Sequence, residues 1–501
     1  MRARPPTITE LLADHPAELP DDPALRALIR QLRAEDGRLL GILDDDPTGS
    51  QAVHDVQVVT TFDEAAYEDA FAAAVGNTGA CFVLTNSRSL PGHAAAALVA
   101  EVARGLLAVA ARRTHGGSGE SSPMPGGAPI DLISRSDSTL RGHVIEEITA
   151  LAGVLREKRG AGPDGVLFVP AFIEAGRLTV GDVHWARGDH GMVPVGETEF
   201  ARDAVFGYSA SNLREFLAAK SGAISADAVA SISLEDIRSG GVSRVREVLA
   251  AASDGNWIVV NAAAYSDLET VSYAVQLAER SGQSFLFRTG PSFVRALSGI
   301  DPRPPLRGQD LARAPERSER LSDHTHGLIV VGSHVGQTTR QLEALMAQHI
   351  VTPVELDVAE LINAGADVVT ATAERVAAAL RLSDVVLYTS REVVRASAGQ
   401  DGLAVARAVS AALAATVRLA LAGEPAWIIA KGGITSHDVA LHGLDIRRAK
   451  VAGQLFPGLI SVFRPADAAP EAIGMPYVVF PGNVGGVDAL AEVVALLHEV
   501  R

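Results

Sequence analysis

Three consecutive aspartates, Asp44, Asp45 and Asp46, stand directly after an apolar run that predicts a strand. Adjacent carboxylates repel one another, so holding them together costs free energy unless cations or hydroxyl groups share the site. Such a group can bind sugar hydroxyls, hold a hydrated Mg²⁺ ion or accept a proton. A solvated turn with an Asp helix cap is the alternative. We favour the chemical interpretation, because a turn rarely needs three acids.

Arginines follow two further predicted strands. Arg135 and Arg141 flank Asp137 in a segment that opens a helix, and Arg88 follows the strand that contains Cys81. Guanidinium groups grip carboxylate or phosphate in bidentate fashion. Helix capping with surface ion pairs explains the segment after Ser134 equally well. Because ligands of open α/β sheets bind at the carboxyl ends of strands, three such ends would form one acid-binding cleft.

The composition of residues 170–184 predicts a polar loop rather than a plain linker. His184, at its end, is weak evidence for catalysis, since an isolated histidine is more often a packed or surface residue.

Glycine-rich turns follow three predicted strands of the second half. They contain Ser333, the run Gly432-Gly433-Ile434-Thr435, and Gly482. Glycine after a strand is common in α/β folds, but three such turns in one domain favour backbone contact with a polyphosphate. None of them fits the P-loop pattern G-x-x-x-x-G-K-[ST], so a P-loop NTPase is excluded, and no G-x-G-x-x-G with a following acid supports a dinucleotide.

Short apolar runs that alternate with longer amphipathic ones must position these residues. Val- and Ile-rich runs between helices predict mainly parallel sheets covered on both faces, and therefore an α/β fold. Predicted strands lie at 39–43, 56–60, 80–85, 130–134, 165–169, 257–261, 284–287, 328–331, 353–356, 385–388, 426–430, 459–462 and 477–480. Predicted helices lie at 92–111, 336–348, 367–381, 402–423 and 486–499.

The 501 residues predict two domains rather than one core. We expect an N-terminal domain at 1–300, a connection at 301–326 and a C-terminal domain at 327–501. Residues 113–129, rich in Gly, Ser and Pro, indicate a surface insertion.

The composition is globular, with 47% hydrophobic and 21% charged residues and a formal net charge of −16. An acidic surface argues against nucleic acid or an anionic membrane as a partner. The single cysteine, Cys81, excludes an intrachain disulfide and a thiolate metal cluster. No apolar core of a signal peptide follows the N-terminus, so we expect a cytoplasmic protein.

Four segments together resemble the four-carbon acid sugar kinase family. They are Asp45-Asp46-Pro47-Thr48-Gly49, Asp137-Ser138-Thr139-Leu140-Arg141-Gly142, Lys431-Gly432-Gly433-Ile434-Thr435-Ser436 and Pro481-Gly482-Asn483-Val484-Gly485. The resemblance implies an N-terminal sugar-acid domain, a C-terminal nucleotide domain and an active site in the cleft between them. Shorter members have an acidic residue where this chain has Ile434.

The resemblance also implies ATP-dependent phosphorylation of a terminal hydroxyl on threonate, erythronate or a 3-oxo-tetronate. It places ATP contacts on Ser333, Gly432, Gly433, Ile434, Thr435 and Gly482, and sugar-acid contacts on Asp45, Asp46, Arg88, Arg135, Asp137 and Arg141. Asp45 or Asp46 would orient the accepting hydroxyl, and Mg²⁺ would neutralise the phosphates. A sugar-acid lyase or aldolase, or a non-catalytic sensor of sugar acid and nucleotide, is the alternative. A homodimer is the ordinary expectation for a metabolic enzyme.

Overall fold

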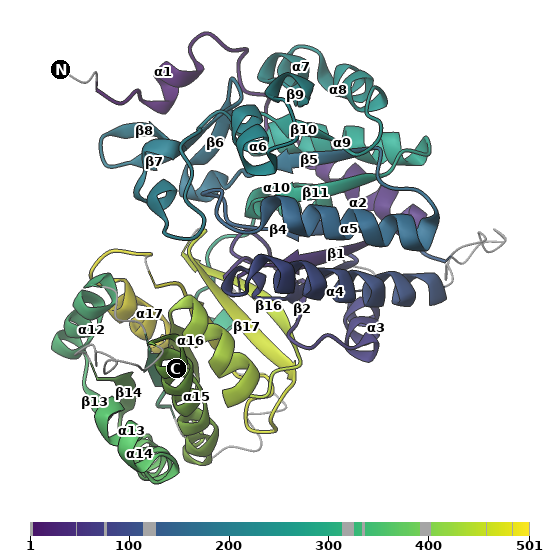
Figure 1. The fold of residues 1–501 in the computed structure, drawn as a ribbon. Coiled ribbons are helices and arrows are strands. Elements are labelled where there is room, and N and C mark those ends of the chain that lie inside the picture. The colour runs from purple at the N-terminus through teal and green to yellow at the C-terminus, as the bar shows by residue number, and fades with distance from the viewer. Residues whose placement is uncertain are drawn as a thin grey trace. The chain divides into compact units, whose positions relative to one another are not determined.

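The computed structural model of the chain forms two compact units (Figure 1). It describes residues 4–46, 48–74, 78–113, 127–312, 325–332, 336–390, 402–456, 458–482 and 484–499. Unit 1 comprises 1–57 and 61–302, and unit 2 comprises 58–60 and 303–501. Residues 58–60 therefore group with unit 2, although the sequence assigns them to the first domain. The physical reason is local, since the Thr60 N–H donates to Arg447 O at 3.2 Å. Most of the predicted insertion and residues 313–324 of the connection lie outside the described residues.

Unit 1 contains a sheet in the order β3-β1-β4-β11-β5-β10-β9, with neighbouring strands parallel. Its strands are β1 (Leu39–Asp44), β3 (Ala80–Leu84), β4 (Ile130–Arg135), β5 (Gly165–Val169), β9 (Ala230–Ile232), β10 (Asn256–Val260) and β11 (Phe285–Thr289). Its helices are α1 (Ile8–Leu12), α2 (Pro23–Asp36), α3 (Glu64–Ala73), α4 (Gly92–Arg112), α5 (Val144–Arg159), α6 (Leu213–Ser221), α7 (Leu234–Arg238), α8 (Gly241–Ala250), α9 (Tyr265–Arg280) and α10 (Pro291–Ser298). Helices α4 and α5 lie in front of this sheet in Figure 1, and α2 and α9 lie behind it. The sequence prediction of an α/β fold with mainly parallel sheets is thus confirmed.

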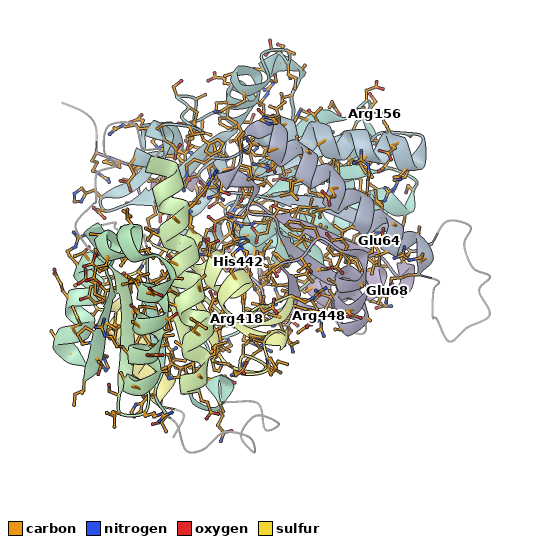
Figure 2. All side chains as sticks on the ribbon, turned by 60° about the horizontal axis from the view of Figure 1, so that its bottom comes forward. Glu64, Glu68, Arg156, Arg418, His442 and Arg448 are labelled. Atoms are coloured by element: carbon orange, nitrogen blue, oxygen red, sulfur yellow. The ribbon has the colours of Figure 1, made fainter. Side chains whose placement is uncertain are left out.

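Helix α4 is long and apolar enough, by length and composition alone, to cross a membrane. In the structure it packs against α3, α5 and β1, as a helix that covers a sheet does. Its last residue, Arg112, pairs with Glu64 at 2.6 Å and reaches Glu68 at 3.8 Å. Figure 2 labels these two glutamates, which both lie on α3.

The predicted polar loop at 170–184 is wrong in part. It contains β6 (Arg177–Val180) and the start of β7 (Val183–Gly188), which form an antiparallel sheet with β8 (Gly191–Pro194). Apolar residues of this sheet pack with those of α1 in a small separate core. Polar residues on the strands hide the alternation that would have predicted them.

Unit 2 contains strands in the order β13-β14-β12-β15-β18-β17-β16, of which the first five are parallel. β17 is antiparallel to both of its neighbours, so this end of the sheet departs from the parallel pattern. The strands are β12 (Leu328–Val331), β13 (Val351–Leu356), β14 (Asp384–Thr389), β15 (Ile428–Lys431), β16 (Arg448–Phe456), β17 (Ile460–Asp467) and β18 (Tyr477–Phe480), with β2 (Gln57–Val59) at the point where the chain joins the two units. The helices are α12 (Gly336–Gln348), α13 (Val358–Ala364), α14 (Ala366–Ala379), α15 (Gly402–Ala420), α16 (Gly433–Asp438) and α17 (Ala489–His498). Side chains of α12 and α17 pack on the central strands in one buried apolar cluster.

Candidate active site

The aspartate run lies at the carboxyl end of β1, between the ends of β3 and β4. Asp44 and Asp45 are buried, and Asp46 keeps a quarter of its side chain exposed. Asp46 accepts the Thr48 N–H at 2.8 Å and its hydroxyl at 2.5 Å, which closes a turn. The Asp44 carboxylate pairs with Arg135, and the Asp45 and Asp46 carboxylates both pair with Arg88, so these guanidinium groups offset the mutual repulsion of the run.

Arg88 lies on a 3-10 turn after β3 and grips Asp45 with two nitrogens. Nη2 donates to Oδ1 at 2.6 Å and Nε to Oδ2 at 3.2 Å, while Nη1 reaches Asp46 at 3.3 Å. Burial raises the pKa of Asp45 to about 6, although the Arg88 guanidinium opposes this shift. Burial lowers the pKa of Arg88, but Asp45, Asp46 and Asp137 raise it more, so it stays charged. Asp45 is thus a buried carboxylate that titrates close to neutral pH.

Arg135, at the end of β4, turns toward the aspartate run from the other side. Its guanidinium is buried, donates to the Asp44 carboxylate and binds the carbonyl oxygen of Asp46 at 2.7 Å. A Cβ on Gly49 would lie within 2.2 Å of this guanidinium, so a side chain there would displace Arg135 from its present position. Burial lowers the pKa of Arg135 to about 9. The sequence assigned the Arg135 guanidinium to the substrate. In the structure this guanidinium instead donates to the aspartate run and positions it.

The segment after β4 forms a tight turn that presents Asp137 and Arg141. Leu140 and Gly142 both take positive φ, at 66° and 112°. Asp137 accepts from Arg141 Nε at 2.6 Å and from the Thr139 hydroxyl. Burial raises the pKa of Asp137, but Arg88, Arg141 and Arg177 lower it more, and the net result is below the usual range. Asp137 is therefore stabilised as an anion by direct contact with Arg141 and by the nearby charges of Arg88 and Arg177.

Two residues of the sheet formed by β6, β7 and β8 hydrogen-bond to Ser138 in this turn. His184 is fully buried, and its ring hydrogen-bonds Ser138 O through Nε2 and Thr179 through Nδ1. Arg177 donates to the Ser138 hydroxyl at 2.8 Å. Burial lowers the pKa of His184 to about 4, so the ring is neutral at physiological pH. His184 is thus a packed residue, as the sequence analysis expected of an isolated histidine.

Glu147 and Arg288 form a buried ion pair that sequence reasoning missed. Glu147, on α5, accepts from the hydroxyls of Ser87 at 2.6 Å and Ser134 at 2.7 Å, and from Arg288 of β11. Both side chains are at most 2% exposed. The pair joins the ends of β3, β4 and β11 beneath the aspartate run. An acid in the first turn of a helix is common in sequences, so no local pattern distinguishes Glu147.

In unit 2 the predicted turns after β15 and β18 lie side by side. Lys431 is in register with both Val331 of β12 and Phe480 of β18. The Gly432 N–H donates to Phe480 O at 2.8 Å, and the Thr338 hydroxyl of α12 donates to Gly482 O at 3.1 Å. The parallel register therefore brings the predicted nucleotide turns to one edge of the sheet.

The individual turn residues differ in exposure. Thr435 is buried against Gly332, where a Cβ would lie 2.5 Å from its hydroxyl, whereas Ile434 is 63% exposed. Gly432 takes φ +115° and precedes Gly433, the first residue of α16. Ser333 lies outside the described residues. Lys431, which the sequence reasoning quoted only as part of a motif, is fully buried here.

We do not assign the expected Mg²⁺ ion to the aspartate run. Among the described residues, no three His, Cys, Asp or Glu side chains are grouped to hold a metal. Asp44, Asp45 and Asp46 take guanidinium partners instead. We therefore assign Mg²⁺ to no residue of this chain.

A cavity of about 820 Å³ lies elsewhere in unit 1, at the amino ends of β4 and β11. Arg38, Asp131 and Glu279 line it, and Arg38 pairs with both carboxylates at 2.7 and 3.3 Å. Because the strands separate this edge from the aspartate run, the cavity is not part of the candidate site.

Comparison with family models assigns a class to each part of the chain. Residues 40–297 match the model of a sugar-binding N-terminal domain, and residues 328–490 match that of a nucleotide-binding C-terminal domain. The chain is thus a two-domain protein that joins a sugar-binding to a nucleotide-binding domain. It belongs to the four-carbon acid sugar kinase family.

Curated relatives match a shorter stretch. A D-erythronate kinase of Heliobacterium modesticaldum is 29% identical over 286 residues, which cover 56% of this chain and 53% of the relative. A D-threonate kinase of Salmonella typhimurium is 28% identical over 274 residues, which cover 54% and 56%. The chain thus spans about half the length of the curated relatives it matches.

Two solved structures share the fold. Protein HI1011 of Haemophilus influenzae has a TM-score of 0.56 at 17% identity, covering 90% of this chain and 99% of its own. A Salmonella typhimurium LT2 protein described as a candidate tRNA synthase has a TM-score of 0.61 at 16% identity, covering 91% and 98%. At these identities the likeness concerns the fold alone.

Proposed function

We propose that the protein transfers the terminal phosphoryl group of ATP to a terminal hydroxyl of a four-carbon sugar acid such as threonate, erythronate or a 3-oxo-tetronate. The observation that carries this proposal is Asp45, a buried carboxylate held by two nitrogens of Arg88 at the carboxyl edge of a sugar-binding domain. The same chain contains a nucleotide-binding domain, and its relatives at 28–29% identity are named erythronate and threonate kinases.

Asp45 is the group we assign to proton transfer. Its pKa of about 6 leaves it ionised above neutral pH, yet basic enough to take a proton from a hydroxyl in the transition state. The accepting oxygen forms a bond to the terminal phosphorus while the bond from that phosphorus to the bridging oxygen of ADP breaks. The hydroxyl proton passes to Asp45 and then to solvent. Positioning and charge stabilisation carry the rest of the reaction.

Arg141 is the best-placed group for the carboxylate of the sugar acid. Its hydrogen bond to Asp137 uses Nε, and a quarter of its side chain is exposed. The guanidinium carbon lies over the Phe200 ring at 5.3 Å from its centroid, and Nη1 lies 3.8 Å from the Asp203 carboxylate. Arg135 is already committed to Asp44 and the Asp46 carbonyl, so we assign it to positioning the aspartate run.

The test is an ADP-release assay with ATP over a panel of four- to six-carbon sugar acids, with ATP alone as the blank. ADP formed above the blank with a four-carbon acid supports the kinase. Cleavage of an acid without ADP would instead identify a lyase or aldolase. Binding of acid and nucleotide without turnover on any acid would identify a sensor, and either of these results overturns the proposal.

A further inference from the structure

Lys431 places a buried ammonium group between the glycine-rich turns that follow β15 and β18 in unit 2. It is the last residue of β15 and is 0% exposed. Its Nζ donates to Pro481 O at 2.6 Å and to Gly482 O at 3.2 Å. The same atom lies 4.0 Å from the centroid of the Phe480 ring. The lysine that precedes the turn after β15 thus binds the backbone of the turn after β18.

No carboxylate of the described residues compensates this ammonium group within 4.0 Å. Burial is the sole cause that lowers the pKa of Lys431, to about 7. The elements packed against it present uncharged groups: Thr338 of α12 binds the same Gly482 carbonyl, and the buried hydroxyl of Tyr477 donates to Ser436 O. Burying an unpaired ammonium group costs several kcal/mol, and a buried apolar side chain would stabilise the unit at less cost.

The geometry of the peptide between Pro481 and Gly482 indicates which backbone group the lysine orients. In a trans peptide the C=O and N–H groups point in opposite directions, and the described chain has no cis peptide. Because the Pro481 carbonyl points at Lys431, the Gly482 N–H of the same peptide points away from it. The lysine therefore fixes the direction of a backbone donor in the turn that the sequence assigns to the nucleotide.

We propose that Lys431 is a positioning residue for the nucleotide, which orients the Gly482 N–H toward the phosphates and takes up a proton when the nucleotide binds. The inference rests on the nucleotide-binding half of the proposed function. Polyphosphate near the turn favours the ammonium form over the neutral amine. With a pKa of about 7 in the free protein, about half of the chains at pH 7 carry a neutral Lys431, and nucleotide binding protonates them.

Calorimetric titration of the full chain with ADP, in two buffers of different ionisation enthalpy, measures this proton. We expect an uptake of about 0.5 proton per ADP at pH 7, falling as the pH is lowered to 5.5. Lys431→Gln keeps an amide NH₂ group as hydrogen-bond donor but cannot be protonated, so it should lose the uptake. Protons from the nucleotide itself are the same in both titrations, and the difference between the two proteins therefore isolates Lys431.

Lys431→Met removes both donors and should weaken ADP binding about 10- to 100-fold, with Lys431→Gln between it and the wild type. The sugar-acid affinity should not change. Lys450→Met, at an exposed lysine of the same unit, is the matched control. The wild-type titration needs no variant, so it tests the proposal even if Lys431→Met fails to fold.

The outcomes separate this inference from the kinase proposal. Wild-type affinity for ADP in Lys431→Met, or equal proton uptake in wild type and Lys431→Gln, would overturn the role of Lys431 alone. ADP binding with the expected uptake, in a protein that phosphorylates no sugar acid, would overturn the kinase and leave Lys431 in its role. A wild-type protein that binds no ADP would overturn both.

Discussion

In unit 1 the ends of β1, β3 and β4 carry charged side chains that pair with one another, whereas in unit 2 the ends of β15 and β18 carry glycines, carbonyls and a buried lysine. Asp45 is held by Arg88 and Asp137 by Arg141. The Gly432 N–H instead donates to the Phe480 carbonyl, and the Gly482 carbonyl accepts from the Thr338 hydroxyl. One unit thus uses side-chain charge and the other uses backbone direction.

This difference determines which substitutions should matter. A change of charge at constant shape should damage unit 1, because each buried carboxylate compensates a guanidinium group. In unit 2, outside Lys431, such a change should matter less than an added Cβ at a glycine of positive φ. Each unit should also fail separately, so that variants of one leave ligand binding by the other intact.

The largest expected effect is on turnover. Asp45→Asn keeps the size of the side chain but removes the proton acceptor, and it should lower kcat about 10²- to 10⁴-fold. The measurement is ADP release at saturating ATP and sugar acid, with KM for ATP unchanged. Asp46→Asn should lose less, since the Asp46 carboxylate mainly closes the turn with Thr48. Full turnover in both variants would remove the carboxylates from the mechanism.

The next effect is on stability. Glu147→Gln leaves Arg288 buried and uncompensated, and it should lower the free energy of unfolding by about 3–5 kcal/mol. Chemical denaturation followed by fluorescence measures it. Glu157→Gln, on the same helix as Glu147, breaks an exposed pair with Arg104 of α4 and should leave the denaturation midpoint unchanged. Equal midpoints in the two variants would mean that the buried pair does not support the strand ends of unit 1.

The sequence predicts the parallel strands well because burial on both faces produces unbroken apolar runs. The strand at 165–169 and the strand at 477–480 have the predicted bounds. The strands β6, β7 and β16 are missed, since polar or charged residues interrupt them and long-range pairing defines them. The antiparallel end of the unit 2 sheet is missed for the same reason.

The residues of the candidate site were also predicted only in part. Residue type was enough to single out Asp45, Arg88 and Asp137, because paired charges at strand ends are rare. Glu147 and Lys431 were not singled out, because their importance comes from burial and from partners distant in the chain. The sequence also could not distinguish the positioning arginine, Arg135, from Arg141, since only the structure shows that Arg135 is buried against Asp44 while a quarter of the Arg141 side chain is exposed.

The pH profile probes the charged unit further. Asp45 must be ionised to accept a proton, so kcat/KM for the sugar acid should be flat above its pKa of about 6 and fall about tenfold per pH unit below it. Steady-state rates from pH 5 to 8 at saturating ATP measure this limb. The residual rate of Asp45→Asn shares any titration of ATP but should lack the limb. A wild-type profile without a break near pH 6 would contradict the role of Asp45.

The smallest effect probes the backbone unit. Gly432 takes φ +115°, which a side chain tolerates poorly, so Gly432→Ala should weaken ADP binding by about tenfold while the sugar-acid affinity stays the same. Gly486→Ala is the matched control, since a Cβ there meets no heavy atom within 4 Å. Calorimetry with each ligand separates the two units. If both alanine variants bind ADP equally well, backbone direction at Gly432 does not govern nucleotide binding, and unit 2 would depend on side chains as unit 1 does.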